Sequence, residues 1–204
     1  MNVQTIEPSA NQTAQPADIV SPPANIRRLV LTGFMGAGKT TVGRLLADRL
    51  GWEFVDLDAA IEEQAGRTIP EIFAADGEAH FRKLESQALA GTLGRNKIVL
   101  ALGGGAPESL TNRLLLEQTP ATTTIFLDAP FSTLFDRCVM QALNPGATHR
   151  PNLADPAAAE ARFHTRQPIY RRLAQHTIET GSLTTEETVA TLLTRLHLPR
   201  PRRR

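Results

Sequence analysis

The chain has 204 residues, of which 41% are hydrophobic and 21% are charged, and its formal net charge is +1. This length and composition predict one globular domain whose core needs no disulfide and no structural metal. The single cysteine, Cys138, excludes an intrachain disulfide and a zinc site built from cysteines, and it favours a reducing, cytoplasmic compartment. No apolar run of about 18 residues is present, so the sequence predicts no membrane-spanning segment.

The composition of both ends differs from that of the middle. Residues 1–26 are rich in Pro, Ala, Gln and Asn and show no hydrophobic periodicity, which predicts a disordered tail. Residues 199–204 contain four arginines and predict a second, basic tail. The body between them has a charge of about −1 and few aromatic residues, so we expect no nucleic-acid partner.

Short apolar runs alternate with segments of helical periodicity along residues 27–198. The expected strands are 29–32, 53–58, 97–102, 122–127 and 176–179. The expected helices are 40–50, 59–65, 69–75, 78–94, 107–118, 131–142, one from about 156 that Pro168 kinks or breaks, and 184–197. This alternation predicts a three-layer α/β domain with a five-stranded parallel sheet and helices on both faces. The turn-rich residues 144–151 predict a mobile excursion, a lid of about 143–156.

A phosphate-binding motif follows the first strand. Residues 33–40, GFMGAGKT, match G-x-x-x-x-G-K-[ST] between an apolar strand and a helix. Glycines let backbone N–H groups surround a phosphate, Lys39 reaches the β- and γ-phosphates, and the Thr40 hydroxyl ligates Mg²⁺. The expected ATP contacts are Gly36, Ala37, Gly38, Lys39, Thr40 and Thr41. This motif occurs in kinases, GTPases, motors and chaperones alike. The function must therefore be inferred from the residues that would bind a phosphoryl acceptor, here called the acceptor side.

Two carboxylates close the second expected strand. Asp56 and Asp58 are two residues apart, a spacing that places both on one face of a strand. One can hold Mg²⁺ through water, and the other can accept a hydrogen bond from an attacking hydroxyl group. The alternative is a pair of solvated turn acids, or Asp58 as the cap of the next helix.

An arginine and a glycine run complete the acceptor side. Arg82 and Glu85 are three residues apart on a helix, and an arginine held by a glutamate presents a rigid fork to a substrate carboxylate. The alternative is an ordinary surface ion pair. Residues 103–105, three glycines after a strand, let a flat ligand approach the backbone closely. The alternative is a flexible strand exit.

Together these motifs resemble the shikimate kinase family. They occur in the family's order over about residues 28–196: residues 33–40, Asp56-x-Asp58, Phe81-Arg82-x-x-Glu85, residues 103–105, Arg150-Pro151 and Arg166-x-Pro168-x-Tyr170-Arg171. The resemblance implies a P-loop kinase fold with a small mobile lid. It also implies ATP-dependent phosphorylation of the 3-hydroxyl of shikimate, on the route to chorismate and the aromatic amino acids. Its partners would be these small molecules and one Mg²⁺ ion, and we expect a monomer.

The resemblance also implies roles for individual residues. Asp58 would hold ring hydroxyls next to the attacking oxygen, and Asp56 would reach Mg²⁺ through water. Arg82 and Arg166 would bind the shikimate carboxylate, and Gly104 would offer its backbone. Arg150, in the lid, would fold over the phosphates as a catalytic group beside Lys39 and Asp58.

The sequence departs from the family in three places. Asn152 interrupts the usual Arg-Pro-Leu-Leu of the lid, and the stretch between Arg137 and Arg150 is longer than usual. Residues 180–183 lack the arginine or glutamine that often contacts adenine.

Other functions left open are a gluconate or nucleoside monophosphate kinase, a regulatory module without catalysis, and an ATPase acting with nucleic acid through the arginine tail. The arginine pair favours an acid substrate over a nucleotide.

Overall fold

The computed structural model describes residues 20–143 and 155–197. Within these residues, five strands form one parallel sheet in the order β2-β3-β1-β4-β5. The strands are β1 Arg28–Thr32, β2 Glu53–Asp56, β3 Ile98–Ala101, β4 Thr122–Asp128 and β5 His176–Glu179. The predicted five-stranded parallel sheet is therefore confirmed.

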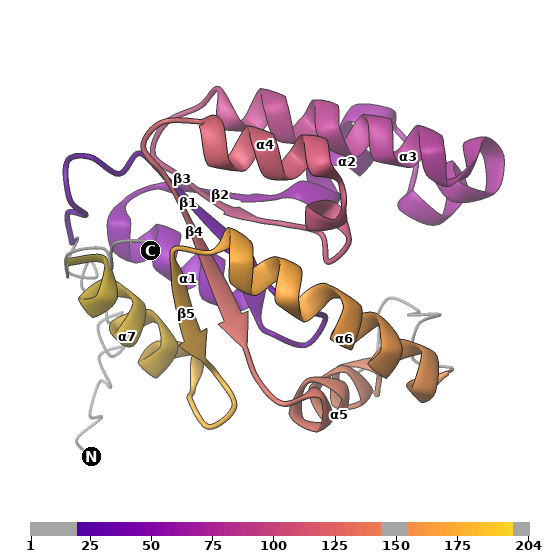
Figure 1. The fold of residues 1–204 in the computed structure, drawn as a ribbon. Helices are drawn as coiled ribbons and strands as arrows, with labels where there is room; N and C mark the ends of the chain where they lie inside the picture. Colours follow the sequence, from indigo (N-terminus) through magenta and orange to yellow (C-terminus); the bar gives the residue numbers. More distant parts are fainter. Residues whose placement is uncertain (1–19, 144–154, 198–204) are drawn as a thin grey trace, which may run out of the picture.

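Helices cover both faces of this sheet. They are α1 Lys39–Leu50, α2 Leu57–Ala65, α3 Ile69–Leu93, the 3₁₀ helix η1 Ala106–Glu108, α4 Leu110–Gln118, α5 Phe131–Ala142, α6 Pro156–Leu173 and α7 Thr185–His197. Helices α2, α3 and α4 lie on one face, and α1 and α7 lie on the other (Figure 1). The predicted three-layer α/β architecture is thus confirmed.

The central strand β1 shows how the two faces form separate cores. Leu29 and Leu31 belong to the core cluster that includes α1 and α7, whereas Val30 belongs to the cluster of α2, α3 and α4. All three side chains are fully buried. Because successive side chains of a strand point to opposite faces, the middle of a central parallel strand is apolar on both faces.

The carboxyl ends of the strands meet at one edge of the sheet. Asp56, the last residue of β2, lies opposite Ala101 of β3, and Ala101 lies opposite Leu31 of β1. The phosphate-binding loop and the glycines at 103–105 therefore begin beside Asp56. Ligands of open α/β sheets bind at this edge.

The predicted strand at 53–58 is wrong at its end. β2 stops at Asp56, whose side chain accepts a hydrogen bond from the backbone N–H of Asp58 and caps α2. Asp58 lies in the first turn of that helix, so the two carboxylates do not share a strand face. The cap is Asp56, and not Asp58 as the alternative interpretation held.

Three expected helix boundaries have different outcomes in the structure. Helix α6 continues through Pro168, which excludes the break, one of the two alternatives expected there. The expected helix at 107–118 divides into η1 and α4 because Ser109 is extended and caps α4 through the backbone N–H of Asn112. The expected break near Gly77 is present as a kink inside α3, where Gly77 has a left-handed φ of 78°.

The first described residues pack against the domain. The backbone N–H of Val20 donates to the carbonyl of Arg49 at 2.8 Å, and Ile26 is a buried member of the core. Residues 20–26 are therefore part of the domain and not of the predicted disordered tail. Residues 1–19, most of the expected lid (144–154) and the arginine tail lie outside the described residues.

We find no helix in residues 20–143 or 155–197 that combines the length and the apolar character needed to cross a bilayer.

Candidate active site

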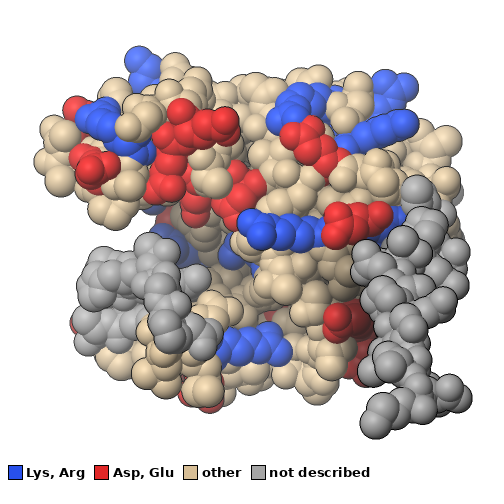
Figure 2. All heavy atoms as spheres, turned by 180° about the vertical axis from the view of Figure 1, so that it is seen from behind, with Lys and Arg blue, Asp and Glu red and all other residues tan. Residues whose placement is uncertain are grey.

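A pocket of about 760 Å³ opens at the carboxyl edge of the sheet. The phosphate-binding loop lines one side, and residues from α2, α3, the loop at 103–105 and α6 line the other. Figure 2 shows the surface hollowed on this side, with acidic side chains gathered on one rim. All the described residues that the sequence assigns to ATP phosphate or acceptor binding come from elements around this pocket.

The phosphate-binding loop is tightly packed around its glycines. Gly36 has a φ of 77°, and a Cβ atom there would lie 2.2 Å from the carbonyl oxygen of Leu134. No other residue fits this position, since both the backbone conformation and the neighbouring carbonyl exclude a side chain. Helix α1 begins at Lys39 without a side-chain cap, and the positive end of its dipole favours an anion there.

Lys39 and Thr40 follow directly on this loop. The Lys39 ammonium donates to the carbonyl oxygens of Gly33 at 2.8 Å and Phe34 at 3.1 Å. The Thr40 hydroxyl donates to Asp56 Oδ2 at 2.9 Å. The predicted pair of metal-binding residues is therefore in direct contact, although it comes from different elements.

Thr40 and Asp56 fit Mg²⁺ by their chemistry. Mg²⁺ prefers oxygen donors and takes one or two protein ligands together with waters and phosphate oxygens. Within the described residues no cluster of three or more His, Cys, Asp or Glu side chains forms a metal cage. A hydroxyl and a carboxylate beside a phosphate-binding loop therefore match an ion carried in with a nucleotide.

Asp58 lies against the glycine run after β3. A Cβ atom on Gly103 would lie 2.4 Å from Asp58 Oδ1, so a glycine is needed for this approach. Burial raises the pKa of Asp58, and the Asp56 carboxylate raises it further, while Lys39 opposes both effects. The carboxyl group thus holds a proton more firmly than an exposed aspartate does.

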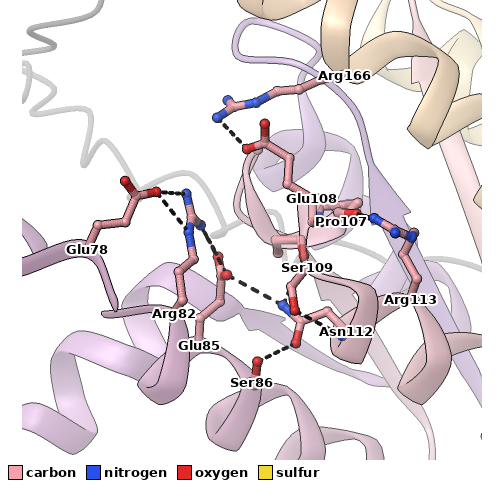
Figure 3. Close-up of polar contacts among 12 residues, drawn as sticks. Glu78, Arg82, Glu85, Ser86, Pro107, Glu108, Ser109, Asn112, Arg113 and Arg166 are labelled. Carbon is pink, nitrogen blue, oxygen red and sulfur yellow. Dashed lines mark hydrogen bonds and ion pairs between the residues drawn. The ribbon is translucent and has the colours of Figure 1, made fainter. Parts of the chain in front are cut away.

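Arg82 is held by two carboxylates of its own helix (Figure 3). Its Nη1 donates to both oxygens of Glu85, at 3.2 and 3.1 Å, and its Nε and Nη2 donate to Glu78 Oε1 at 3.3 and 3.0 Å. The Glu85 side chain is only 1% exposed, which excludes the interpretation as an ordinary surface ion pair. Burial raises the pKa of Glu85, and the Arg82 guanidinium lowers it.

Asn112 completes this network from α4, and the sequence analysis missed it. Its side chain is fully buried; Nδ2 donates to Glu85 Oε2 at 3.4 Å and to the Ala106 carbonyl at 2.9 Å. Its Oδ1 accepts from the Ser86 hydroxyl at 2.7 Å (Figure 3). No local pattern could have found this residue, because its partners lie elsewhere in the chain.

Arg166 reaches the same pocket from α6. Its Nη1 would lie 3.7 Å from a Cβ atom on Gly104, and its Nη2 donates to Glu108 Oε2 at 2.7 Å. The Tyr170 hydroxyl, whose pKa burial raises, donates to the Gly104 carbonyl at 2.5 Å. The structure therefore brings together Arg82, Gly104 and Arg166 as predicted, and it adds Glu108, which the sequence analysis missed.

Arg137 and Arg150 mark the two ends of the stretch that is longer than usual in this sequence. Arg137 donates through Nη2 to the carbonyl oxygens of Thr180 at 2.7 Å and Gly181 at 3.3 Å, which ties α5 to the loop after β5. Arg150, the expected lid arginine, lies outside the described residues, as does Asn152.

Comparison with known proteins identifies the family. The family model described as shikimate kinase matches residues 35–197. A shikimate kinase from Symbiobacterium thermophilum is 41% identical over 171 residues, which cover 82% of this chain and 95% of that relative. A solved structure of a shikimate kinase from Acinetobacter baumannii in complex with shikimate has a TM-score of 0.74 and 36% identity, and covers 84% of this chain and 93% of its own.

A kinase of another substrate class shares the fold only. The solved gluconokinase from Sinorhizobium meliloti has a TM-score of 0.59 and 18% identity, and the match covers 84% of this chain and 92% of that one. The much higher identity to shikimate kinases, over most of both chains, agrees with the motifs that surround the pocket. The chain therefore belongs to the shikimate kinase family.

Proposed function

We propose that this chain transfers the γ-phosphoryl group of ATP to the 3-hydroxyl of shikimate and releases ADP and shikimate 3-phosphate. The observation that carries the proposal is that Arg82 and Arg166, from helices far apart in the sequence, line one pocket with the phosphate-binding loop and Asp58. Two guanidinium groups suit a carboxylate, and the loop suits a triphosphate. An acid with a hydroxyl group can thus be held beside the γ-phosphate.

On the nucleotide side, residues 36–41 bind the phosphates in this proposal. Backbone N–H groups of the loop and the start of α1 supply hydrogen bonds, and Lys39 neutralises charge on the transferred group. Arg150 would add positive charge from the lid. A nucleotide-bound Mg²⁺, held by Thr40 directly and by Asp56 through water, would neutralise charge on the β- and γ-phosphates.

On the acceptor side, Arg82 and Arg166 bind the carboxylate, Gly104 contacts the ring through its backbone, and Asp58 accepts a hydrogen bond from the 3-hydroxyl. The hydroxyl oxygen then bonds to the γ-phosphorus while the bond from that phosphorus to the bridging oxygen of ADP breaks. The hydroxyl proton leaves to Asp58. Positioning and charge neutralisation supply most of the rate, because the transition state of phosphoryl transfer is loose.

Replacement of Asp58 by asparagine is expected to lower kcat by about 10²-fold, because the proton acceptor is lost. In the wild type kcat/KM falls as the pH drops through the raised pKa of Asp58, and this acidic limb disappears in the variant. Steady-state kinetics between pH 5 and about pH 9 measure both effects. A variant that keeps the wild-type rate and limb would contradict the role of Asp58.

The same variant is expected to be more stable at neutral pH. Because the pKa of Asp58 is raised on folding, its contribution to stability is present below the unfolded pKa and is lost as the pH rises through the folded pKa. Asparagine carries no charge at either pH, so its melting temperature should exceed the wild type's at pH 7, and the gap should shrink in acid. A less stable variant at pH 7 would mean that the attraction of Lys39 and Arg82 for the Asp58 carboxylate exceeds the cost of burying its charge.

The identity of the acceptor is tested by ADP release from Mg-ATP, measured with shikimate, quinate, gluconate or AMP in turn. We expect strong release with shikimate only. Release with gluconate or AMP would mean that the protein is a kinase of this fold that acts on another acceptor. Nucleotide binding without release for any acceptor would favour a regulatory module.

We also propose that the enzyme acts with one Mg²⁺ ion per ATP, as a monomer in the cytoplasm. Removal of the ion by a chelator is expected to reduce ADP release to the background, and excess Mg²⁺ should restore it, because Thr40 and Asp56 offer too few ligands to retain the ion alone. A preparation that stays active in excess chelator would contradict this proposal.

A further inference from the structure

We propose that Glu108 is a specificity-determining residue whose carboxylate occupies Arg166 in the free enzyme and must be displaced by the carboxylate of the substrate. This inference rests on the proposed function, in which Arg166 binds that carboxylate. The ion pair joins Glu108 Oε2 to Arg166 Nη2 at 2.7 Å, across 58 positions of the chain. Figure 3 shows the two side chains pointing toward each other from η1 and α6.

Glu108 differs from the carboxylate that holds Arg82. Glu85 is 1% exposed, accepts two hydrogen bonds from Arg82 and is bound by the buried Asn112. Glu108 is 36% exposed, and among the described residues its carboxylate has Arg166 as its hydrogen-bond partner. Arg82 is therefore fixed by the fold, whereas Glu108 can rotate into solvent at the cost of one partly exposed ion pair.

The charges on the acceptor side make the displacement of Glu108 from Arg166 unfavourable for most anions. Two guanidinium groups, of Arg82 and Arg166, stand beside the carboxylates of Asp58, Glu78, Glu85 and Glu108, and Glu62 lines the same pocket. An anion that bonds to Arg166 alone must displace Glu108 and gains one partner in exchange. A substrate carboxylate that bonds to both arginines gains two, so Glu108 favours ligands that bridge the arginine pair.

The replacement Glu108→Gln keeps the size of the side chain and removes its charge. KM for shikimate is expected to fall about two- to fivefold, the range for loss of one partly exposed ion pair, with kcat and KM for ATP unchanged. Inorganic phosphate, competing with shikimate, should inhibit the variant more strongly than the wild type. The binding of shikimate methyl ester, which has no negative charge, should not change.

Two further variants separate the proposal from simpler explanations. Glu117→Gln removes the same charge from an exposed position on the neighbouring helix α4 and should leave KM unchanged. In an Arg166→Ala background, Glu108→Gln should have no effect on kcat/KM for shikimate, because the residue it competes for is gone.

The outcomes are distinct. An unchanged or raised KM in Glu108→Gln would overturn the proposal, and a raised KM would mean that Glu108 positions Arg166. If Glu108→Gln still improves the use of shikimate in the Arg166→Ala background, or if Glu117→Gln lowers KM equally, the proposal would also be overturned. The effect would then come from the overall negative charge of the protein and not from the contact between Glu108 and Arg166. If Arg166→Ala alone leaves KM for shikimate unchanged, the proposed carboxylate site fails instead.

Discussion

Replacement of Lys39 by alanine is expected to lower kcat by about 10²–10³-fold and to raise KM for ATP less. Lys39 belongs to the phosphate-binding loop, where its ammonium lies on the carbonyl oxygens of Gly33 and Phe34. In the proposed function the Lys39 ammonium moves to the transferred phosphoryl group. Removal of one preorganised donor from an enzyme active site typically lowers kcat by about 10²–10³-fold. Steady-state kinetics with saturating shikimate measure the change.

Two control variants make the Lys39 result specific. Lys39→Arg keeps the charge but replaces a compact ammonium by a planar fork, so we expect it to restore little activity. Lys83→Ala removes an exposed lysine of α3 and should leave kcat unchanged. A Lys39→Ala enzyme within about threefold of the wild type would show that the loop does not act as described, since one electrostatic contact is worth more.

Replacement of Arg82 by alanine is expected to raise KM for shikimate by about 10²-fold, because two charge-assisted hydrogen bonds to the substrate carboxylate are lost. It should also destabilise the fold by about 1–3 kcal/mol, since Glu85 remains buried without its guanidinium. The cost is at the lower end of such effects because Arg82 is 28% exposed and Glu85 can take up a proton. Kinetics and thermal unfolding measure the two effects separately.

The double replacement of Arg82 by alanine and Glu85 by glutamine separates binding from stability. Glutamine keeps the hydrogen bond from Asn112 and removes the buried charge, so the melting temperature should recover while KM for shikimate stays high. Recovery of both properties would mean that Arg82 acts only as the partner of Glu85. Recovery of neither would mean that the salt bridge itself organises α3.

The fold was predictable because the sequence pattern is consistent at every level. The strands at Arg28–Thr32 and Thr122–Asp128 are buried throughout, and each is followed by a loop and a helix. The phosphate-binding loop has a local signature, since its glycines must adopt conformations that other residues avoid. Arg82 and Glu85 share a helix face, so their contact also follows from spacing.

The errors have equally local causes. The end of β2 was misplaced because Val55 and Leu57 continue an alternating pattern, whereas the cap made by Asp56 starts the helix there. At Pro168 a kink or a break of α6 was expected; the helix does not break, and Tyr170 and Leu173 are buried beyond the proline. In this helix tertiary packing outweighs the local cost of a proline.

The roles of Glu108 and Asn112 could not be read from the sequence. Arg166 is 58 positions from Glu108, and Glu85 is 27 positions from Asn112. A lone glutamate after a glycine run and an asparagine in the first turn of a helix are ordinary surface and capping residues in most proteins. Their partners are set by how α3, α4 and α6 meet at the edge of the sheet.

A crystal structure of the complex with shikimate, ADP and Mg²⁺ would show where the substrate carboxylate and the 3-hydroxyl bind. We expect the shikimate carboxylate to bond to both Arg82 and Arg166, with Glu108 turned away and the 3-hydroxyl within hydrogen-bond distance of Asp58. We also expect the ADP phosphates to bind to the loop at residues 33–40. A carboxylate bound away from the two arginines, or a 3-hydroxyl remote from Asp58, would contradict it.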